Sequence, residues 1–89
     1  MNTIKFTLRT KAKAMIEEMK YNKVPIMEVD ENTYKIVIPV CCETKLYDFI
    51  ADLAEDCEAT VEIEVFYQDP GTGESSRDIT SIVNGKFVD

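Results

Sequence analysis

The chain has 89 residues, with 17 acidic and 10 basic side chains, a formal net charge of −7 and no histidine. A chain this short forms one small domain, and its excess of carboxylates repels phosphate, so we expect no direct nucleic acid binding. Because histidine is the commonest general base and transition-metal ligand, its absence argues against an enzyme and against a metal or other cofactor.

The first two elements are predicted by their apolar periods. Apolar and polar residues alternate over Thr3–Arg9, which predicts a strand with one buried face. After Thr10, a candidate N-cap, apolar residues recur at helical spacing and predict a helix that runs to about Asn22.

A hairpin is predicted next. Two β-branched segments, Val24–Val29 and Thr33–Val40, flank the turn-forming residues 30–32. Pro39 conflicts with a central position for the second strand, because proline cannot donate a backbone hydrogen bond. Either this strand ends by Ile38, or it lies nearer to a sheet edge.

The second helix is predicted from Glu43 or Thr44 to about Glu58, and a strand follows over Thr60–Tyr67. The order strand, helix, strand, strand, helix, strand over residues 3–67 resembles that of ferredoxin-like proteins. The resemblance implies an α+β sandwich, in which a four-stranded antiparallel sheet carries two helices on one face. It concerns element order alone, so it implies no function.

Charge is unevenly distributed along the chain. Lysines crowd the start of the first predicted helix and carboxylates crowd the end of the second, so both clusters oppose the helix dipoles. In the ferredoxin-like arrangement the two helices are antiparallel neighbours, and we expect the two clusters to attract each other. On the sheet, Lys5 and Arg9 should lie near Glu62 and Glu64.

The C-terminal part is predicted to extend a single domain over residues 1–89, whose core is residues 3–67. Residues 68–78 read as a turn-rich linker, and Asn84-Gly85 between two apolar runs predicts a hairpin over residues 79–89. This hairpin either covers a sheet edge or pairs two chains into a homodimer.

Cys41 and Cys42 stand where a strand gives way to a helix, a position that can activate a thiol. The parity of the strand instead places Cys42 against the core as a small apolar residue and Cys41 near the surface. We favour the second interpretation, because no histidine is present. With Cys57, the thiols match no disulfide or zinc pattern, and no apolar run approaches the roughly 18 residues of a membrane span. We expect a cytoplasmic protein that binds no membrane.

Residues 43–64 are strongly acidic and hold eight carboxylates against one lysine. Such a surface can bind a partner protein with a basic surface and accelerate their encounter. We therefore predict a non-enzymatic interaction protein that inhibits or regulates its partner, by analogy with the small modulators that phages or mobile elements carry. The alternative is an ordinary solvated face. The predicted partner-binding residues are Asp48, Asp52, Glu55, Asp56, Glu58, Glu62 and Glu64.

A second hypothesis concerns the start of the first helix. There Thr10, Lys11 and Lys13 combine a hydroxyl and two ammonium groups with free backbone N–H groups, a combination that can bind an anion. This hypothesis predicts a small dimeric module for ligand sensing or assembly, which binds an anionic metabolite.

Overall fold

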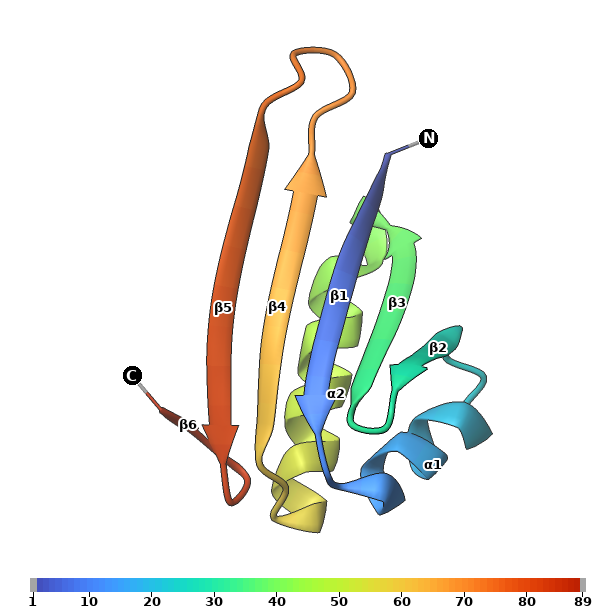
Figure 1. The fold of residues 1–89 in the computed structure, drawn as a ribbon, viewed down its shortest axis with the longest axis vertical. Coiled ribbons are helices and arrows are strands. Elements are labelled where there is room, and N and C mark those ends of the chain that lie inside the picture. The colour runs from blue at the N-terminus through green and yellow to red at the C-terminus, as the bar shows by residue number, and fades with distance from the viewer. Residues whose placement is uncertain (1, 89) are drawn as a thin grey trace.

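The protein is an α+β fold with two helices and one six-stranded antiparallel sheet, seen in a computed structural model that describes residues 2–88 (Figure 1). The predicted class is confirmed, and the sheet has six strands rather than four because both strands of the predicted C-terminal hairpin join it. The elements are β1 (Thr3–Thr10), α1 (Lys13–Tyr21), β2 (Ile26–Asp30), β3 (Thr33–Pro39), a short 3-10 helix (Val40–Cys42), α2 (Glu43–Cys57), β4 (Val61–Gln68), β5 (Ser75–Val83) and β6 (Lys86–Val88).

The strand order across the sheet is β2-β3-β1-β4-β5-β6. β1 lies between β3 and β4, so Phe6 faces Ile36 on one side and Val65 on the other. The expected pairing of the first and fourth strands is therefore present.

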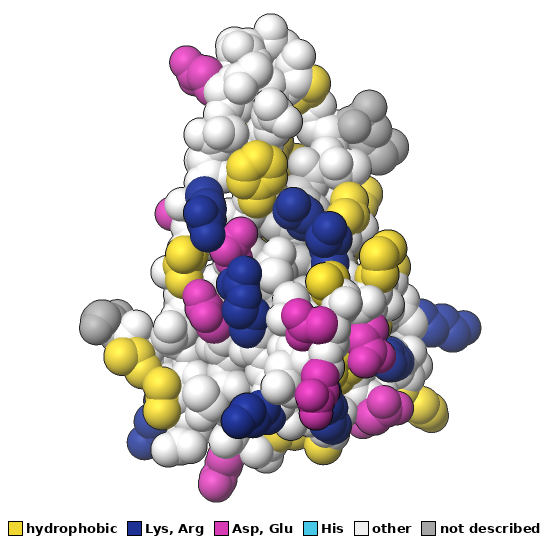
Figure 2. All heavy atoms as spheres, viewed as in Figure 1, with side chains coloured by type: hydrophobic (Ala, Val, Ile, Leu, Met, Phe, Trp, Pro, Cys, Tyr) yellow, Lys and Arg dark blue, Asp and Glu magenta, His cyan; other side chains and the backbone are white. Residues whose placement is uncertain are grey.

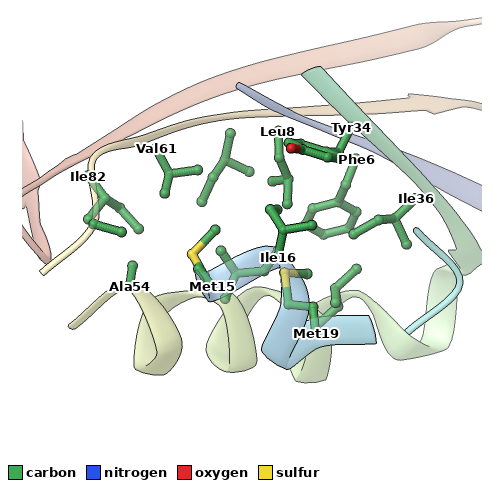
Figure 3. Close-up of a cluster of buried hydrophobic side chains, with 14 of the residues drawn as sticks. Phe6, Leu8, Met15, Ile16, Met19, Tyr34, Ile36, Ala54, Val61 and Ile82 are labelled. Carbon is green, nitrogen blue, oxygen red and sulfur yellow. The ribbon is translucent and has the colours of Figure 1, made fainter. Parts of the chain in front are cut away.

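The core lies between one face of the sheet and the two helices. Figure 3 shows Met15, Ile16 and Met19 of α1 and Ala54 of α2 directed toward side chains of the strands. Period-two alternation in the strands and helical spacing in α1 and α2 bring these apolar positions together. The buried apolar residues of the strands are Ile4, Phe6, Leu8, Tyr34, Ile36, Ile38, Val61, Ile63 and Ile82.

Thr10 is not the N-cap of α1, because the helix begins two residues later than that role requires. Ala12 occupies the N-cap position without a side-chain hydrogen bond. The Thr10 hydroxyl instead accepts a hydrogen bond from the N–H of Ala12 (3.0 Å) and donates one to the carbonyl of Thr60 (2.8 Å). This buried hydroxyl thus joins the β1–α1 connection to the α2–β4 connection.

Pro39 is accommodated because β3 is a central strand along only part of its length. The N–H of Val40 donates to the carbonyl of Asn2 ahead of β1 (3.1 Å), so the Pro39 nitrogen points the other way, toward β2. β2 does not extend that far, since its last pair with β3 joins Ile26 to Ile36. Pro39 therefore lacks an N–H only on the side of β3 where no neighbouring strand is present to accept a hydrogen bond.

The predicted linker over residues 68–78 is too long, because β5 already begins at Ser75. Residues 75–78 pair with residues 65–68 of β4, and the pairing continues to Ile82. The C-terminal hairpin therefore covers the edge of β4. Its second strand, β6, pairs only with Ser81, Ile82 and Val83.

The lysines at the start of α1 and the carboxylates at the end of α2, which were expected to attract each other, form no ion pair in residues 2–88. The start of α1 and the end of α2 lie at the same end of the molecule (Figure 1). Within residues 2–88, however, neither Lys11 nor Lys13 approaches a carboxylate within 4 Å. The Lys13 ammonium donates to the Tyr34 hydroxyl (2.6 Å) and to the Glu31 carbonyl, because the β2–β3 turn lies within its reach.

The turn between β5 and β6 packs against the end of α2. Asn84 and Gly85 both have positive φ (52° and 84°), as a two-residue hairpin requires. A Cβ on Gly85 would lie 3.0 Å from the carbonyl oxygen of Ala54 and 3.0 Å from the Cα of Glu55. The Gly85 N–H donates to the carbonyl of Ala59 (2.9 Å). Glycine is thus required by both the backbone and the space.

We predict that Gly85→Ala destabilises the protein much more than Gly73→Ala. Gly73 also has a positive φ (78°), but an added Cβ there meets no atom within 4 Å. The left-handed backbone alone costs about 1 kcal/mol, whereas the clash at Gly85 raises the loss to about 3 kcal/mol. Urea unfolding of both variants measures the difference. Equal midpoints would show that the turn does not press on α2.

Candidate functional site

Five of the predicted partner-binding residues form one cluster on the outer side of α2. Leu46, Ile50 and Ala54 of this helix are buried in the core. The five carboxylates lie on the remaining side and are exposed, and none of them makes an ion pair within 4 Å among residues 2–88. We call them the helix cluster: Asp48, Asp52, Glu55, Asp56 and Glu58.

The end of α2 is unfavourable in both charge and backbone geometry. No basic residue lies in its last turn, so the carboxylates there oppose the helix dipole. Glu58 adopts the left-handed conformation (φ 50°) that glycine usually provides at this position. The N–H of Ala59 still donates to the carbonyl of Ala54 (2.8 Å), which closes the helix. The fold itself gains nothing from a glutamate at this position.

The other two predicted residues, Glu62 and Glu64, lie on the opposite face of the sheet. Their neighbours Val61 and Ile63 face the core, so alternation directs both carboxylates to the side without helices. The sheet therefore separates them from the helix cluster. A flat partner surface cannot contact both groups together.

Glu62 and Glu64 are also neutralised by arginines. The Arg9 guanidinium lies 3.6 Å from the Glu62 carboxylate and 3.5 Å from that of Glu64, and Arg77 lies 2.8 Å from Glu64. Figure 2 shows this uncovered face, where dark blue and magenta side chains lie together over the middle of the sheet. The sequence predicted the proximity of Arg9. It did not predict Arg77, because residue 77 was placed in a linker.

The pairing perturbs the titration of Glu64. The hydrogen bond from Arg77 lowers the pKa of this carboxyl below its ordinary value of 4.5, and the charges of Arg77 and Arg9 lower it further. The Glu64 side chain is only 14% exposed, so the pairing is screened less than at the surface. Glu64 belongs to a neutral network rather than to an acidic surface.

The rest of the uncovered face is mixed in character. The Lys5 ammonium lies 5.3 Å from the centre of the Phe66 ring, next to a hollow of about 330 Å³. The hollow is lined by Asn2, Thr3, Lys5, Val37, Phe66, Gln68 and Pro70. The strand register places Lys5 opposite Val37 and Phe66 on this face, and within residues 2–88 Lys5 makes no ion pair with the Glu62 or Glu64 that it was expected to approach.

The predicted anion site is only partly assembled. Thr10 is 5% exposed and its hydroxyl already has two partners, while Lys13 is directed to the β2–β3 turn. A hollow of about 320 Å³ nevertheless lies beside this helix start, lined by Arg9, Thr10, Lys11, Asn32 and Thr60. Arg9 and Lys11 are the cations at its border.

The adjacent cysteines lie as the strand parity predicted. Cys42 packs against the core and Cys41 is exposed, with 3.9 Å between their sulfur atoms. The hydrogen bond with Cys41 raises the pKa of the Cys42 thiol, and partial burial raises it further. The environment therefore disfavours the thiolate of Cys42.

No protein-family model, curated protein or solved structure matches the chain. In residues 2–88 no helix is long and apolar enough to cross a membrane. The same residues contain no group of three or more cysteine, aspartate or glutamate side chains placed to hold a metal ion. A function for the protein is therefore inferred from its charges and contacts.

We predict that Arg77→Gln raises the pKa of the Glu64 carboxyl more than Arg9→Gln does, because Arg77 makes the shorter contact. The lowered pKa stabilises the fold fully above the ordinary value of 4.5, and this contribution is lost as the pH falls through the folded-state pKa. Carboxyl ¹³C NMR titration of the native protein and both variants measures the shift. An unchanged titration in Arg77→Gln would contradict the network.

Proposed function

We propose that the protein is a small, non-enzymatic interaction protein that binds a partner with a basic surface through the helix cluster and thereby inhibits or regulates it. Its action would be cytoplasmic, and it could serve as a modulator of the kind that phages and mobile elements carry. We also propose that residues 3–67 are a ferredoxin-like unit to which β5 and β6 have been added.

The observation that carries this proposal is the unneutralised charge at the end of α2. Charges scattered over a surface keep a protein soluble with little loss of stability. Carboxylates at a helix C-terminus instead oppose the dipole, by roughly 0.3–1 kcal/mol each when exposed. Lys86 borders the same hollow as Glu55 and Glu58, but none of these carboxylates makes an ion pair within 4 Å in the described chain. A protein that keeps several of them there is best explained by a function that requires them.

The geometry of α2 suits a basic groove. Asp48, Asp52 and Asp56 are spaced by one helical step of four residues, so they follow one side of the helix at intervals of about 6 Å. The exposed helix offers this row without displacing any internal ion pair. Glu62 and Glu64, in contrast, would have to release Arg9 and Arg77 before binding.

We predict that neutralising four carboxylates of the helix cluster abolishes partner binding. The helix variant carries Asp48→Asn, Asp52→Asn, Glu55→Gln and Asp56→Asn. The control variant carries Glu18→Gln, Glu28→Gln, Glu31→Gln and Glu74→Gln, which change the net charge equally at exposed sites elsewhere. Proteins from the native host that the unchanged protein captures should remain with the control and be lost with the helix variant.

Two further measurements test whether any loss of binding results from the lost charge rather than from unfolding. Urea unfolding should show that the helix variant is at least as stable as the native protein, because it removes charge that opposes the dipole. The association rate with a purified partner should fall as salt rises. Capture of the same proteins by the helix variant would overturn the proposal.

A second candidate function is a dimeric module that senses an anionic metabolite or assists assembly. The hollow beside the start of α1 favours it, since the exposed Lys11 lines this space together with Arg9, although Arg9 is also paired with Glu62 and Glu64. We predict that millimolar phosphate or nucleotide raises the Tm of the native protein but not that of Lys11→Ala. Lys23→Ala is the matched control, because Lys23 is exposed at the far end of α1. An unchanged Tm of the native protein would remove this candidate.

A further inference from the structure

The outer edge of β5 is uncovered over most of its length. β5 has nine residues. Only three of them, Ser81, Ile82 and Val83, pair with β6. Residues 75–80 have β4 on one side and, within residues 2–88, no strand on the other. Six residues of an extended strand thus border solvent.

The turn geometry determines which backbone groups are free. A two-residue hairpin closes with a hydrogen-bonded pair, here Val83 and Lys86, so the N–H and C=O groups of Val83 point away from β4. Because these directions alternate along a strand, those of Ser75, Arg77 and Ile79 also point outward. Three residues therefore offer unpaired donors and acceptors in one row.

The opposite edge of the sheet is protected in ways that β5 is not. β2 has only five residues and follows Pro25, and its pairing shifts between Glu28 and Asp30. A short strand, a proline and a bulge all hinder the addition of another strand. β5 contains no proline, and its pairing with β4 runs without a register shift. The two edges differ in their readiness to accept a strand.

Pairing of this edge with a second copy of the chain meets a charge conflict. A two-fold axis perpendicular to the sheet places one residue of β5 opposite itself. An axis at residue 77 sets Arg77 against its own copy, and an axis at residue 78 does the same with Asp78. An axis at Ser76 opposes Asp78 with Glu74. Like charges directly opposite each other are destabilising. An axis at Ile79 avoids this conflict but sets Arg77 against Ser81, which β6 already pairs. A different chain therefore fits better.

We propose that the β5 edge binds an extended segment of a partner protein, which adds to the sheet as a further strand. On the uncovered face this segment would meet Ile79, which is 54% exposed, and Arg77, which Glu64 already neutralises. On the helix side it would meet Asp78, which is exposed and makes no ion pair within residues 2–88. A segment that alternates apolar and basic residues matches both faces.

This mode of binding uses backbone hydrogen bonds for affinity and alternate side chains for specificity. An apolar residue would pack beside Ile79, and a lysine or arginine beside Asp78 would gain from the net charge of −7. The edge of β5 is separate from the helix cluster, so the inference does not depend on the function proposed for α2.

The test uses the full chain, labelled with ¹⁵N, and a short peptide in which lysine and valine alternate. We expect this peptide to slow hydrogen exchange at the Arg77 and Ile79 amides and to leave the β2 amides unchanged. A peptide with glutamate in place of lysine should bind several-fold more weakly. Asp78→Asn should weaken binding of the lysine peptide more than the four-residue helix variant does, although the helix variant removes four times as much charge.

A pair of variants separates edge binding from general attraction of a cationic peptide. Ile79→Pro removes an N–H that the sheet does not use, so the protein should stay folded and lose the peptide. Ile79→Val keeps the N–H and should bind. If Ile79→Pro does not fold, two N-methylated peptides replace it. In each, methyl groups block the N–H groups along one of the two edges of the extended peptide. Only the peptide whose free N–H groups can face β5 should still bind.

Three results would overturn the proposal. The first is an Ile79→Pro variant that folds and binds as the native protein does, and the second is no protection of the Arg77 and Ile79 amides at millimolar peptide. The third is a concentration-dependent dimer, seen by sedimentation, in which these amides are protected without peptide. In that case a second copy covers the edge.

Discussion

Burial of one face of the sheet is the constraint on which the rest of the structure depends. Phe6 and Leu8 of β1 are fully buried, and each such side chain contributes roughly 1.5–3 kcal/mol. An exposed ion pair contributes about 0–1 kcal/mol. The apolar residues therefore fix the parity of each strand, and the charged residues follow. A slip of one residue would expose the whole apolar set of β1 to water.

The same constraint divides an acidic stretch of sequence into two chemically different groups. Carboxylates on α2 remain exposed and unpaired within the described chain, whereas Glu62 and Glu64 are delivered to the far face beside Arg9 and Arg77. The sequence therefore predicted a single acidic surface, whereas the fold places these carboxylates on two separate faces. The period-two alternation of β4 was visible in the sequence and indicates that Glu62 and Glu64 share one face. The pairing of Arg77 with Glu64 could not be predicted, because it depends on β5 joining the sheet beside β4.

Elements with one buried face were predictable, and those without one were not. β1, β3, β4 and both helices carry an apolar period because a core lies on one side of each. The first five residues of β5 are exposed, so no alternation marks them as a strand. Backbone pairing with β4 holds them instead. The partners of Thr10 and Lys13 were missed for a related reason, since each side chain binds a residue distant in sequence.

The added hairpin displaces the sheet edge rather than closing it. It is fixed at its base, where Asn84 and Gly85 donate to Thr60 and Ala59 and where the rings of Phe87 and Tyr47 stack 5.9 Å apart. These contacts lie beside α2, so β6 is anchored where a helix can hold it. In the described chain α2 lies behind the middle of the sheet rather than behind the first half of β5, whose first five residues are exposed (Figure 1). Residues 75–80 are therefore held by backbone pairing with β4 rather than by burial of their side chains.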